Sequence, residues 1–252
     1  DLNITHIIRG EDHVTNTGVQ IEIFHALKAA PPIFAHFPLL IGADGEGLSK
    51  RLGSLSIEAL RGDGIEPLAV VSHLAKLGTS EPVAARDSLA TLAKEFAWDK
   101  IGRAPARFDV EELKRVNADV LHLMDYTAAK PRLAALGVDH GEGFWLAVRG
   151  NLTVFDDVKT WAGVVSGEIA PVVENAAFLG EAAALLPAGP YDETAWSAWT
   201  NAVKAKTGAK GKQLYMPLRL ALTGQPHGPE MPKLFALLSE AKVRARLAGK
   251  AA

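Results

Sequence analysis

The sequence contains no cysteine and no long hydrophobic run, and each absence excludes a class of protein. Without cysteine, the chain can form neither a disulfide nor a thiolate metal site, which fits a cytosolic enzyme. No apolar run approaches the roughly 20 residues of a membrane-spanning helix. No charged and then apolar leader precedes a cleavage site, so secretion is not expected. We therefore expect a cytoplasmic protein without a membrane partner, globular because 48% of its residues are hydrophobic and 22% charged.

Metal-ligand spacing and internal repeats are absent too. The eight histidines show no pattern such as His-x-x-x-His, so no protein metal site is expected. No repeat of fixed period and no low-complexity tract occurs. The 252 residues suffice for two ordinary domains, and the chain enters a strand-like stretch directly after Asp1 without an initiating methionine. That beginning is typical of a fragment of a longer protein.

Charge is unevenly distributed along the chain. The net charge is −2, yet residues 201–252 contain ten Lys or Arg and only two Glu, a balance of +8. Residues 1–200 therefore carry −10. A basic end on an acidic body favours a localised anionic partner, although a solvated helical surface explains the same charges equally well.

Hydrophobic patterning predicts a small α/β part followed by helices. Residues 3–9 are rich in β-branched side chains and predict a buried strand. Residues 15–17 can cap a helix, and residues 34–41 predict a second strand. Strand, helix and strand make a βαβ unit, whose ligands bind at the carboxyl ends of the strands. Beyond residue 56 helices are expected near 56–60, 67–77, 87–96, 109–124, 125–136, 142–150, 154–167, 174–186, 191–206, 217–222 and 230–248.

An apolar stripe and four tryptophans bear on packing. Val19, Ile23, Ala26 and Leu27 recur at helical spacing after the first strand and predict a packed helix face. The tryptophans also occupy helical positions, which favours core anchors over platforms for nucleic-acid bases; they are Trp145, Trp161, Trp196 and Trp199.

Residues 9–13 read Arg-Gly-Glu-Asp-His and directly follow the first predicted strand. An arginine at that position can hold a carboxylate through two hydrogen bonds. The alternative is an ordinary helix start, with Glu11 and Asp12 placed favourably against the helix dipole.

Residues 47–51, Gly-Leu-Ser-Lys-Arg, lie in a glycine-rich loop after the second predicted strand. Such a loop suits a polyphosphate, because its backbone can approach an anion while Lys50 supplies a mobile charge and Arg51 a forked donor. A P-loop is excluded because Leu48 separates the last glycine from the lysine, and the dinucleotide fingerprint fails on spacing.

The string from Ile8 to Thr17 and the loop at 47–51 together resemble the second half of a class I aminoacyl-tRNA synthetase active site, of the glutamyl type. The resemblance implies that Arg9 contacts the substrate glutamate. It also implies that Asp12 and His13 surround the ribose and adenine of ATP.

The same resemblance assigns catalysis to the loop. Its usual form is Lys-Met-Ser-Lys-Ser, so Gly47 replaces the first lysine, a departure that puts ATP binding in doubt unless Arg51 compensates. Lys50 fills the place of the second lysine, which stabilises charge on the phosphates as the adenylate forms, with Ser49 beside it. Leu40, with Leu39, resembles the adenine-side contacts of the family, or else belongs to the core.

Residues 211–229 resemble the anticodon-binding helices of bacterial glutamyl-tRNA synthetases. By that resemblance Lys210, Lys212 and Arg219 are candidate tRNA contacts, with phosphate positioning as the modest assignment. The structural alternative packs Met216, Leu218 and Leu222 and uses Gly224 and Gly228 in turns. Both interpretations are compatible.

Class I synthetases also carry a His-x-Gly-His type motif, and no such tetrapeptide occurs here. The resemblance therefore covers the C-terminal portion of the family: the rear of the catalytic domain over 1–55, a helical stem-contact region over 56–108 and a helical anticodon-binding region over 109–252. The implied parent reaction joins glutamate to tRNA through glutamyl-adenylate, using ATP accompanied by Mg²⁺. We predict a monomer that is inactive on its own.

Three alternatives stay open at this point. The chain could be a tRNA-binding module without catalysis, which its basic end favours. A glutaminyl relative fits less well, because that family uses β-barrels for the anticodon, and the short tRNA-modifying paralogues lack an anticodon region. Whether the tRNA is only of the glutamate type or also of the glutamine type is not decided by the sequence.

Overall fold

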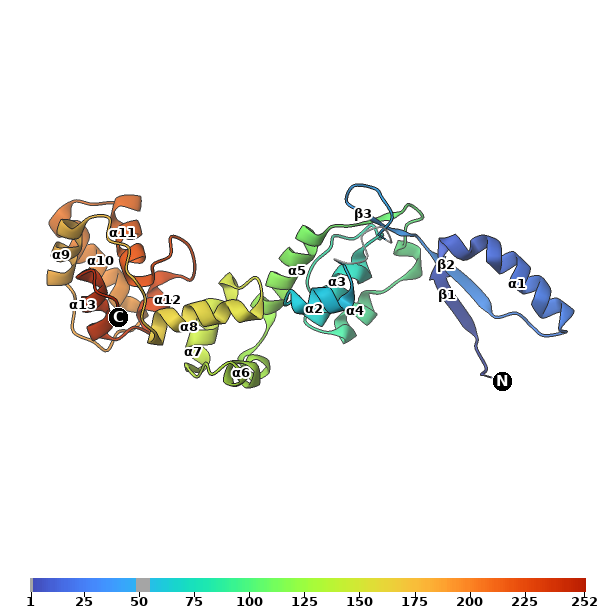
Figure 1. Ribbon diagram of the computed structural model, residues 1–252, viewed down its shortest axis with the longest axis horizontal. Coiled ribbons are helices and arrows are strands. Elements are labelled where there is room, and N and C mark those ends of the chain that lie inside the picture. The colour runs from blue at the N-terminus through green and yellow to red at the C-terminus, as the bar shows by residue number, and fades with distance from the viewer. Residues whose placement is uncertain (1, 49–54) are drawn as a thin grey trace. The chain divides into compact units, whose positions relative to one another are not determined.

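The computed structural model describes residues 2–48 and 55–252. The chain divides into two compact units, Asp1–Val120 and Leu121–Ala252, drawn in blue to green and in green to red in Figure 1. Ser49, Lys50 and Arg51, the catalytic residues implied by the resemblance, lie outside the described residues. The division into two units does not test the finer boundaries at residues 55 and 108, which stay predictions.

The first unit begins with the predicted βαβ unit. Strand β1 (His6–Gly10) leads through the short 3-10 helix η1 (Glu11–His13) into α1 (Val14–Ala26), and β2 (Ile33–Phe37) returns parallel to β1. A parallel pair needs such a crossover connection, and here the helix supplies it. The mainly helical fold class with a small α/β part is thereby confirmed.

The second predicted strand, 34–41, is wrong as a single element. It divides into β2 and β3 (Leu40–Gly42), with Pro38 between them, because proline cannot donate a ladder hydrogen bond. Strand β3 pairs in parallel with β4 (Ala106–Phe108), so the two halves of the predicted strand belong to different sheets. The sequence did not predict β4, because three residues are too few to show a period of two.

Helix α1 also differs from expectation. It begins at Val14, one residue before the predicted cap, and has no side-chain cap. Its apolar stripe is not packed: Val19, Ile23 and Leu27 are 57%, 52% and 73% exposed. The opposite face of the β1–β2 sheet is open as well, with Ile8 and Ile33 more than half exposed. A βαβ unit by itself has no further layer to cover the outer side of its helix or the second face of its sheet. The predicted packed stripe of α1 is therefore exposed.

The remaining helices of the first unit surround a small core. They are α2 (Ile57–Gly62), α3 (Pro67–Lys76), α4 (Leu89–Glu95), the 3-10 helix η3 (Trp98–Lys100) and α5 (Val110–Leu123). Ser56 and Ser88 cap α2 and α4, each accepting a hydrogen bond from a backbone N–H three residues later. Leu60, Ala69 and Leu113 form the centre of the core, to which β4 contributes Phe108.

The second unit is helical throughout its described elements. These are α6 (Tyr126–Ala135), α7 (Gly141–Val148), η4 (Arg149–Asn151), η5 (Phe155–Asp157), α8 (Val158–Ser166), α9 (Ala176–Ala184), α10 (Glu193–Thr207), α11 (Lys212–Thr223), α12 (Met231–Phe235) and α13 (Glu240–Leu247). The single helix predicted at 230–248 is two helices, because Ser239 caps α13 by accepting the amide of Lys242. Within the described residues, no helix is both long and apolar enough to cross a bilayer.

The four tryptophans are core anchors, as predicted, with at most 7% of each exposed. The predicted turn glycines are confirmed as well. Gly224 ends α11 in the left-handed conformation, with φ of 67°. Gly228 adopts φ of 140°, and a Cβ there would lie 2.0 Å from Cη2 of Trp161, so the position needs glycine on two grounds.

Candidate functional site

Arg9 lies on the sheet face that α1 covers. The register of the parallel pair places Arg9 opposite His36 and Ile7 opposite Phe34, and side chains on one face alternate along each strand. His36 and Phe34 therefore share the face of Arg9. The guanidinium lies 5.4 Å from the Phe34 ring centroid, within cation–π range.

Neutral acceptors on α1 hold the Arg9 side chain. Its Nη2 donates to Oγ1 of Thr17 at 2.6 Å and to Oε1 of Gln20 at 2.7 Å. Its Nε is buried and has no hydrogen-bond partner among the described residues, and no carboxylate in that part of the chain pairs with Arg9. The charge is therefore fixed in place without being neutralised, which suits an anionic ligand.

Asp12 and His13 follow one turn beyond Arg9 in η1. Their side chains are about half exposed, and His13 Nε2 lies 3.7 Å from Asp12 Oδ2. The neighbouring Glu11 accepts a hydrogen bond from the backbone N–H of Leu39 at 3.3 Å. That bond ties the end of β1 to the segment that enters β3. The structure thus brings the first predicted motif next to Leu39 and Leu40.

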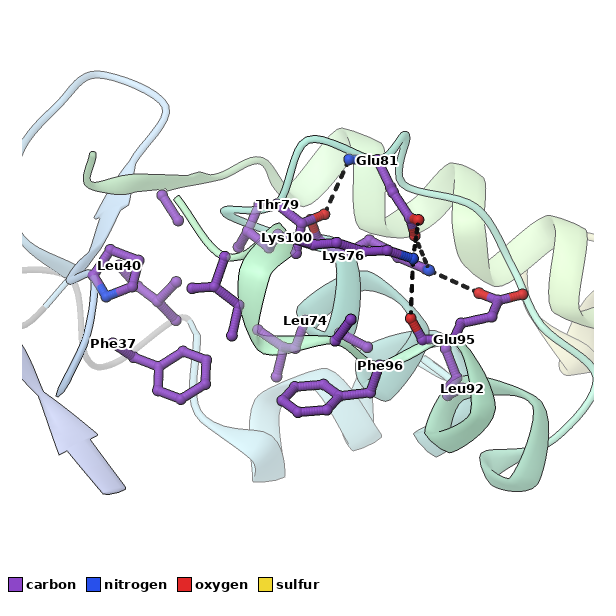
Figure 2. A pocket seen from close by; sticks show the side chains of 16 residues that line it. Phe37, Leu40, Leu74, Lys76, Thr79, Glu81, Leu92, Glu95, Phe96 and Lys100 are labelled. Carbon is purple, nitrogen blue, oxygen red and sulfur yellow. Dashed lines mark hydrogen bonds and ion pairs between the residues drawn. The ribbon is translucent and has the colours of Figure 1, made fainter. Parts of the chain in front are cut away.

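Leu40 lines a cavity of about 270 Å³ in the first unit, shown in Figure 2. Most of the labelled apolar side chains gather around one part of it, namely Phe37, Leu40, Leu74 and Phe96, while Leu92 lies beside Glu95. Phe96 stacks edge-on against Trp98, with ring centroids 5.1 Å apart, and both rings are about half exposed. The cavity is therefore mostly apolar where Leu40 meets it.

An ionic cluster closes the other part of that cavity (Figure 2). Lys76 has only 4% of its side chain exposed, and it pairs with both Glu81 and Glu95. Lys100 binds Glu81 at 2.5 Å, and Arg86 binds Glu95 at 2.8 Å. These partners, Arg86 foremost, lower the pKa of Glu95 to about 2. Since every charge of the cluster has a partner inside the cluster, its evident role is to join α3, α4 and η3.

Nine of the ten basic residues of the C-terminal segment fall into two groups in the second unit, and the tenth, Lys250, is exposed. Several contact their own fold. Arg246 is fully buried and donates to backbone carbonyls, Lys242 also donates to backbone carbonyls, and Lys233 pairs with Glu230. Four others lie exposed around the turn between α10 and α11, with no ion pair in the described part of the chain. We name these four the basic turn: Lys204, Lys206, Lys210 and Lys212.

Lys212 also lines an open hollow of about 850 Å³, together with Phe178, Gln213, Met216 and His227. The turn that carries the basic residues depends on two glycines with positive φ, Gly208 at 72° and Gly211 at 52°. Two of the three predicted tRNA contacts, Lys210 and Lys212, thus lie together.

Arg219, the third predicted tRNA contact, is half-buried and lies apart from the basic turn. Its Nη2 donates to the carbonyl of Pro229, while burial lowers the pKa of the guanidinium. Its Nη1 is buried without a hydrogen-bond partner among the described residues. Arg219 lines a second hollow, of about 510 Å³, with Trp196, Tyr215 and Met231. The guanidinium is therefore held by the fold through Nη2, and the residue borders that hollow.

Sequence reasoning did not single out Gln20 and His36, and it assigned Thr17 only to a helix cap. Their role depends on the register of β1 against β2 and on the helix face of α1, where positions 17 and 20 lie one turn apart. Neither relation is visible before the strand pairing is known. Among residues 2–48 and 55–252, no three His, Asp or Glu side chains are grouped in a way that could hold a metal ion.

Two protein families match the chain. Residues 1–115 match the catalytic domain of the class I tRNA synthetases, described as "E and Q", and residues 171–250 match an anticodon-binding domain. Among curated relatives, glutamate–tRNA ligase 1 of Maricaulis maris is 56% identical over 253 residues, covering 100% of this chain and 57% of that protein. Glutamate–tRNA ligase 1 of Parvibaculum lavamentivorans is 53% identical, covering 99% and 56%. The chain thus spans little more than half the length of these relatives.

Solved structures share the fold. A glutamate–tRNA ligase from Elizabethkingia meningosepticum, crystallised with its amino acid, superimposes with a TM-score of 0.77 at 23% identity. The glutamate–tRNA synthetase of Elizabethkingia anophelis gives 0.75 at 24%. Each match covers 98% of this chain and 56% of the other.

Proposed function

We propose a part in glutamate–tRNA ligation for this chain, whose residues 1–115 belong to the class I tRNA synthetase (E and Q) catalytic family and whose residues 171–250 belong to an anticodon-binding family. The observation that carries the proposal is continuous similarity, because a relative named glutamate–tRNA ligase matches 100% of the chain at 56% identity. The chain corresponds to the C-terminal portion of such a ligase. Its part is to hold glutamate, contribute the signature loop and bind tRNA.

Arg9 is the proposed glutamate contact. Its fixed, unneutralised guanidinium at the carboxyl end of β1 is where a parallel sheet binds ligands. Within the described residues Nη1 of Arg9 is neither enclosed nor hydrogen-bonded, so a carboxylate can accept from it in a charge-assisted hydrogen bond. Asp12, His13 and Leu40 are the proposed contacts to ATP, supported by the Glu11–Leu39 hydrogen bond that brings the two segments together.

Lys50, with Ser49 and Arg51, remains the proposed phosphate contact, on the resemblance of the loop alone. Preorganised positive charge lowers the barrier as the carboxylate of glutamate displaces pyrophosphate from ATP. Mg²⁺ would accompany ATP on its phosphates. We propose that the protein works in the cytoplasm as a monomer.

The C-terminal unit is the proposed tRNA-binding part. The basic turn carries four exposed lysines, and phosphate contacts of this kind position a nucleic acid without reading its sequence. Arg219 lines a hollow together with Tyr215, which is 47% exposed. Unstacked bases bind to aromatic faces and arginine planes, so this hollow suits the anticodon. The finer domain boundaries, 1–55, 56–108 and 109–252, belong to this proposal.

The chain alone should not activate glutamate, because it lacks the His-x-Gly-His motif and its sheet is open on one face. The test is ATP–pyrophosphate exchange with glutamate and tRNA present. We expect exchange at background for the chain alone. Exchange above background would contradict that part of the proposal.

A tRNA-binding module without catalysis is the second candidate, favoured by the basic turn and by the compactness of the second unit. A gel shift separates it from non-specific polyanion binding. Preference for a glutamate tRNA over bulk RNA supports a tRNA-reading role, and equal affinity for any polyanion contradicts it. The same titration with a glutamine tRNA tests whether that type is also bound.

A further inference from the structure

We propose that Thr17, Gln20 and His36 are positioning residues that set the direction in which Arg9 presents its charge. The inference rests on the proposed function only in naming glutamate as the ligand of Arg9. The hydrogen-bond network itself is a property of the β1–α1–β2 unit.

The protons of the network are determined by its geometry. Thr17 Oγ1 lies 2.9 Å from the carbonyl oxygen of His13, which can only accept, so the single hydroxyl proton of Thr17 points there. The same oxygen lies 2.6 Å from Arg9 Nη2 and 2.9 Å from His36 Nε2. Both nitrogens must therefore donate to Thr17, and His36 carries a proton on Nε2.

The Thr17 oxygen is consequently saturated, with one proton donated and two lone pairs occupied. Thr17 is only 8% exposed, so water does not readily replace any of these three bonds. Gln20, one helical turn further along α1, takes a second hydrogen bond from the same Arg9 Nη2. Two acceptors on one nitrogen fix the plane of the guanidinium, while Phe34 lies 5.4 Å away on the same sheet face.

The consequence is a directed arginine. Nη2 is fully used by α1, and the buried Nε has no partner in the described part of the chain. Nη1, which is neither enclosed nor hydrogen-bonded in that part of the chain, is thus the nitrogen available to a ligand carboxylate. Because a charge-assisted hydrogen bond requires the guanidinium to point at the ligand, loss of Thr17 should weaken carboxylate binding even though Thr17 does not touch the ligand.

The first test uses the 252-residue chain and NMR of its nitrogen-15 side chains. In the native chain we expect His36 with its proton on Nε2, and separate Nη signals for Arg9, because rotation of the guanidinium is restricted. Arg103, which is exposed and has no hydrogen bond to another side chain among the described residues, is the reference for averaged signals. In Thr17→Val we expect averaged Arg9 Nη signals and loss of the preference of His36 for a proton on Nε2. Thr17→Ser, which keeps the hydroxyl, should preserve both native observations.

Thermal unfolding of each variant accompanies these spectra. A lower melting temperature of Thr17→Val does not test the proposal, because loss of the hydroxyl lowers stability whether Thr17 positions Arg9 or only supports the fold. The Arg9 and His36 signals are the test. If Thr17→Val leaves the Arg9 Nη signals separate and His36 protonated on Nε2, the positioning role is overturned. Averaged Arg9 signals in the native chain overturn it as well.

The second test fuses this chain to the remainder of the Maricaulis maris relative and measures aminoacylation. Thr17→Val should raise the KM for glutamate about 10-fold, the effect of one lost charge-assisted hydrogen bond, with the KM for ATP within about 2-fold. Thr17→Ser should retain Arg9 in place, and Gln20→Leu should behave as Thr17→Val. Equal rises in both KM values contradict positioning of Arg9. A fusion without any activity counts against the proposed function, while the spectra still decide the present inference.

Discussion

Lys76 Nζ lies 2.7 Å from Glu95 Oε2 although only 4% of the lysine side chain is exposed. An ammonium so deeply buried requires partners, and Glu81 provides the second one from the turn after α3. The pairs join α3, α4 and the segment around η3, which carry the helical side of the first unit. The cluster therefore holds α3, α4 and η3 together.

Lys76→Met should destabilise the first unit by about 2 kcal/mol, below the 3–5 kcal/mol of a fully buried pair because both carboxylates are about a third exposed. Chemical denaturation followed by circular dichroism measures the change. Lys94→Met, at an exposed lysine next to Glu95 on α4, is the matched control and should stay within about 0.5 kcal/mol. Equal effects of the two substitutions would contradict the role of the cluster.

His73 should make the first unit less stable in mild acid. Its ring is fully buried, neither nitrogen has a hydrogen-bond partner in the described residues, and burial lowers its pKa despite Glu112 and Asp109 nearby. The unfolded chain then binds the proton more readily than the folded chain. The contribution of His73 to the unfolding free energy is therefore fully present above its ordinary pKa of 6.5, and it is lost as the pH falls below that value.

Two replacements that cannot be protonated test this assignment. His73→Leu and His73→Phe differ in volume, yet both should flatten the dependence of unfolding free energy on pH between pH 7.5 and 5.5. Phe108, whose ring centroid lies 5.0 Å from the His73 ring, provides an apolar neighbour for either. A slope unchanged from the native chain in both variants would show that His73 is not the titrating group.

Gly228→Ala should destabilise the second unit by about 3 kcal/mol, because the added methyl group meets the Trp161 ring and the backbone has φ of 140°. Gly180→Ala is the control, since it lies inside α9 with open space around it and should stabilise by about 0.5–1 kcal/mol. Thermal unfolding of both variants gives the comparison. A neutral Gly228→Ala would mean that the 225–229 turn packs differently against α8.

The basic turn should contribute salt-dependent affinity for tRNA. Replacing its four lysines by glutamine should weaken binding to every tRNA alike and reduce the slope of log affinity against log salt by about 3, since each of the four phosphate contacts contributes about 0.7–0.9. Lys233→Gln is the control, because that ammonium is already paired with Glu230 at 2.8 Å. A slope that falls equally in the control, or not at all in the fourfold variant, rejects the basic turn as the contact surface.

Much of the helical fold could be predicted from the sequence because its signals are local. Ser56 as a cap, Pro67 at a helix start and Gly224 at a helix end each act within one turn, and each is observed at the expected place. The four tryptophans of the second unit are buried as their helical positions predict. Errors arose where partners are distant: β4 pairs with a strand more than 60 positions earlier, and α1 lacks a layer to cover its stripe.

The candidate site was predictable only in part, for the same reason. Arg9, Asp12 and His13 form a contiguous string and were found together, but the hydrogen bonds that fix Arg9 come from residues on α1 and β2. Charge counting treated all ten basic residues of the C-terminal segment alike, whereas Arg246 is wholly committed to the fold. Only side-chain packing separates a basic residue that supports the fold from one available to tRNA.

Glutamylation of tRNA by this chain fused to the remainder of the Maricaulis maris relative tests the central claim most directly. We expect transfer of glutamate, and not of glutamine, to a glutamate tRNA, with activity lost in Lys50→Ala and in Arg9→Ala while both variants remain folded. Absence of charging by a folded fusion, or charging with a different amino acid, would contradict the assignment of this chain to glutamate–tRNA ligation.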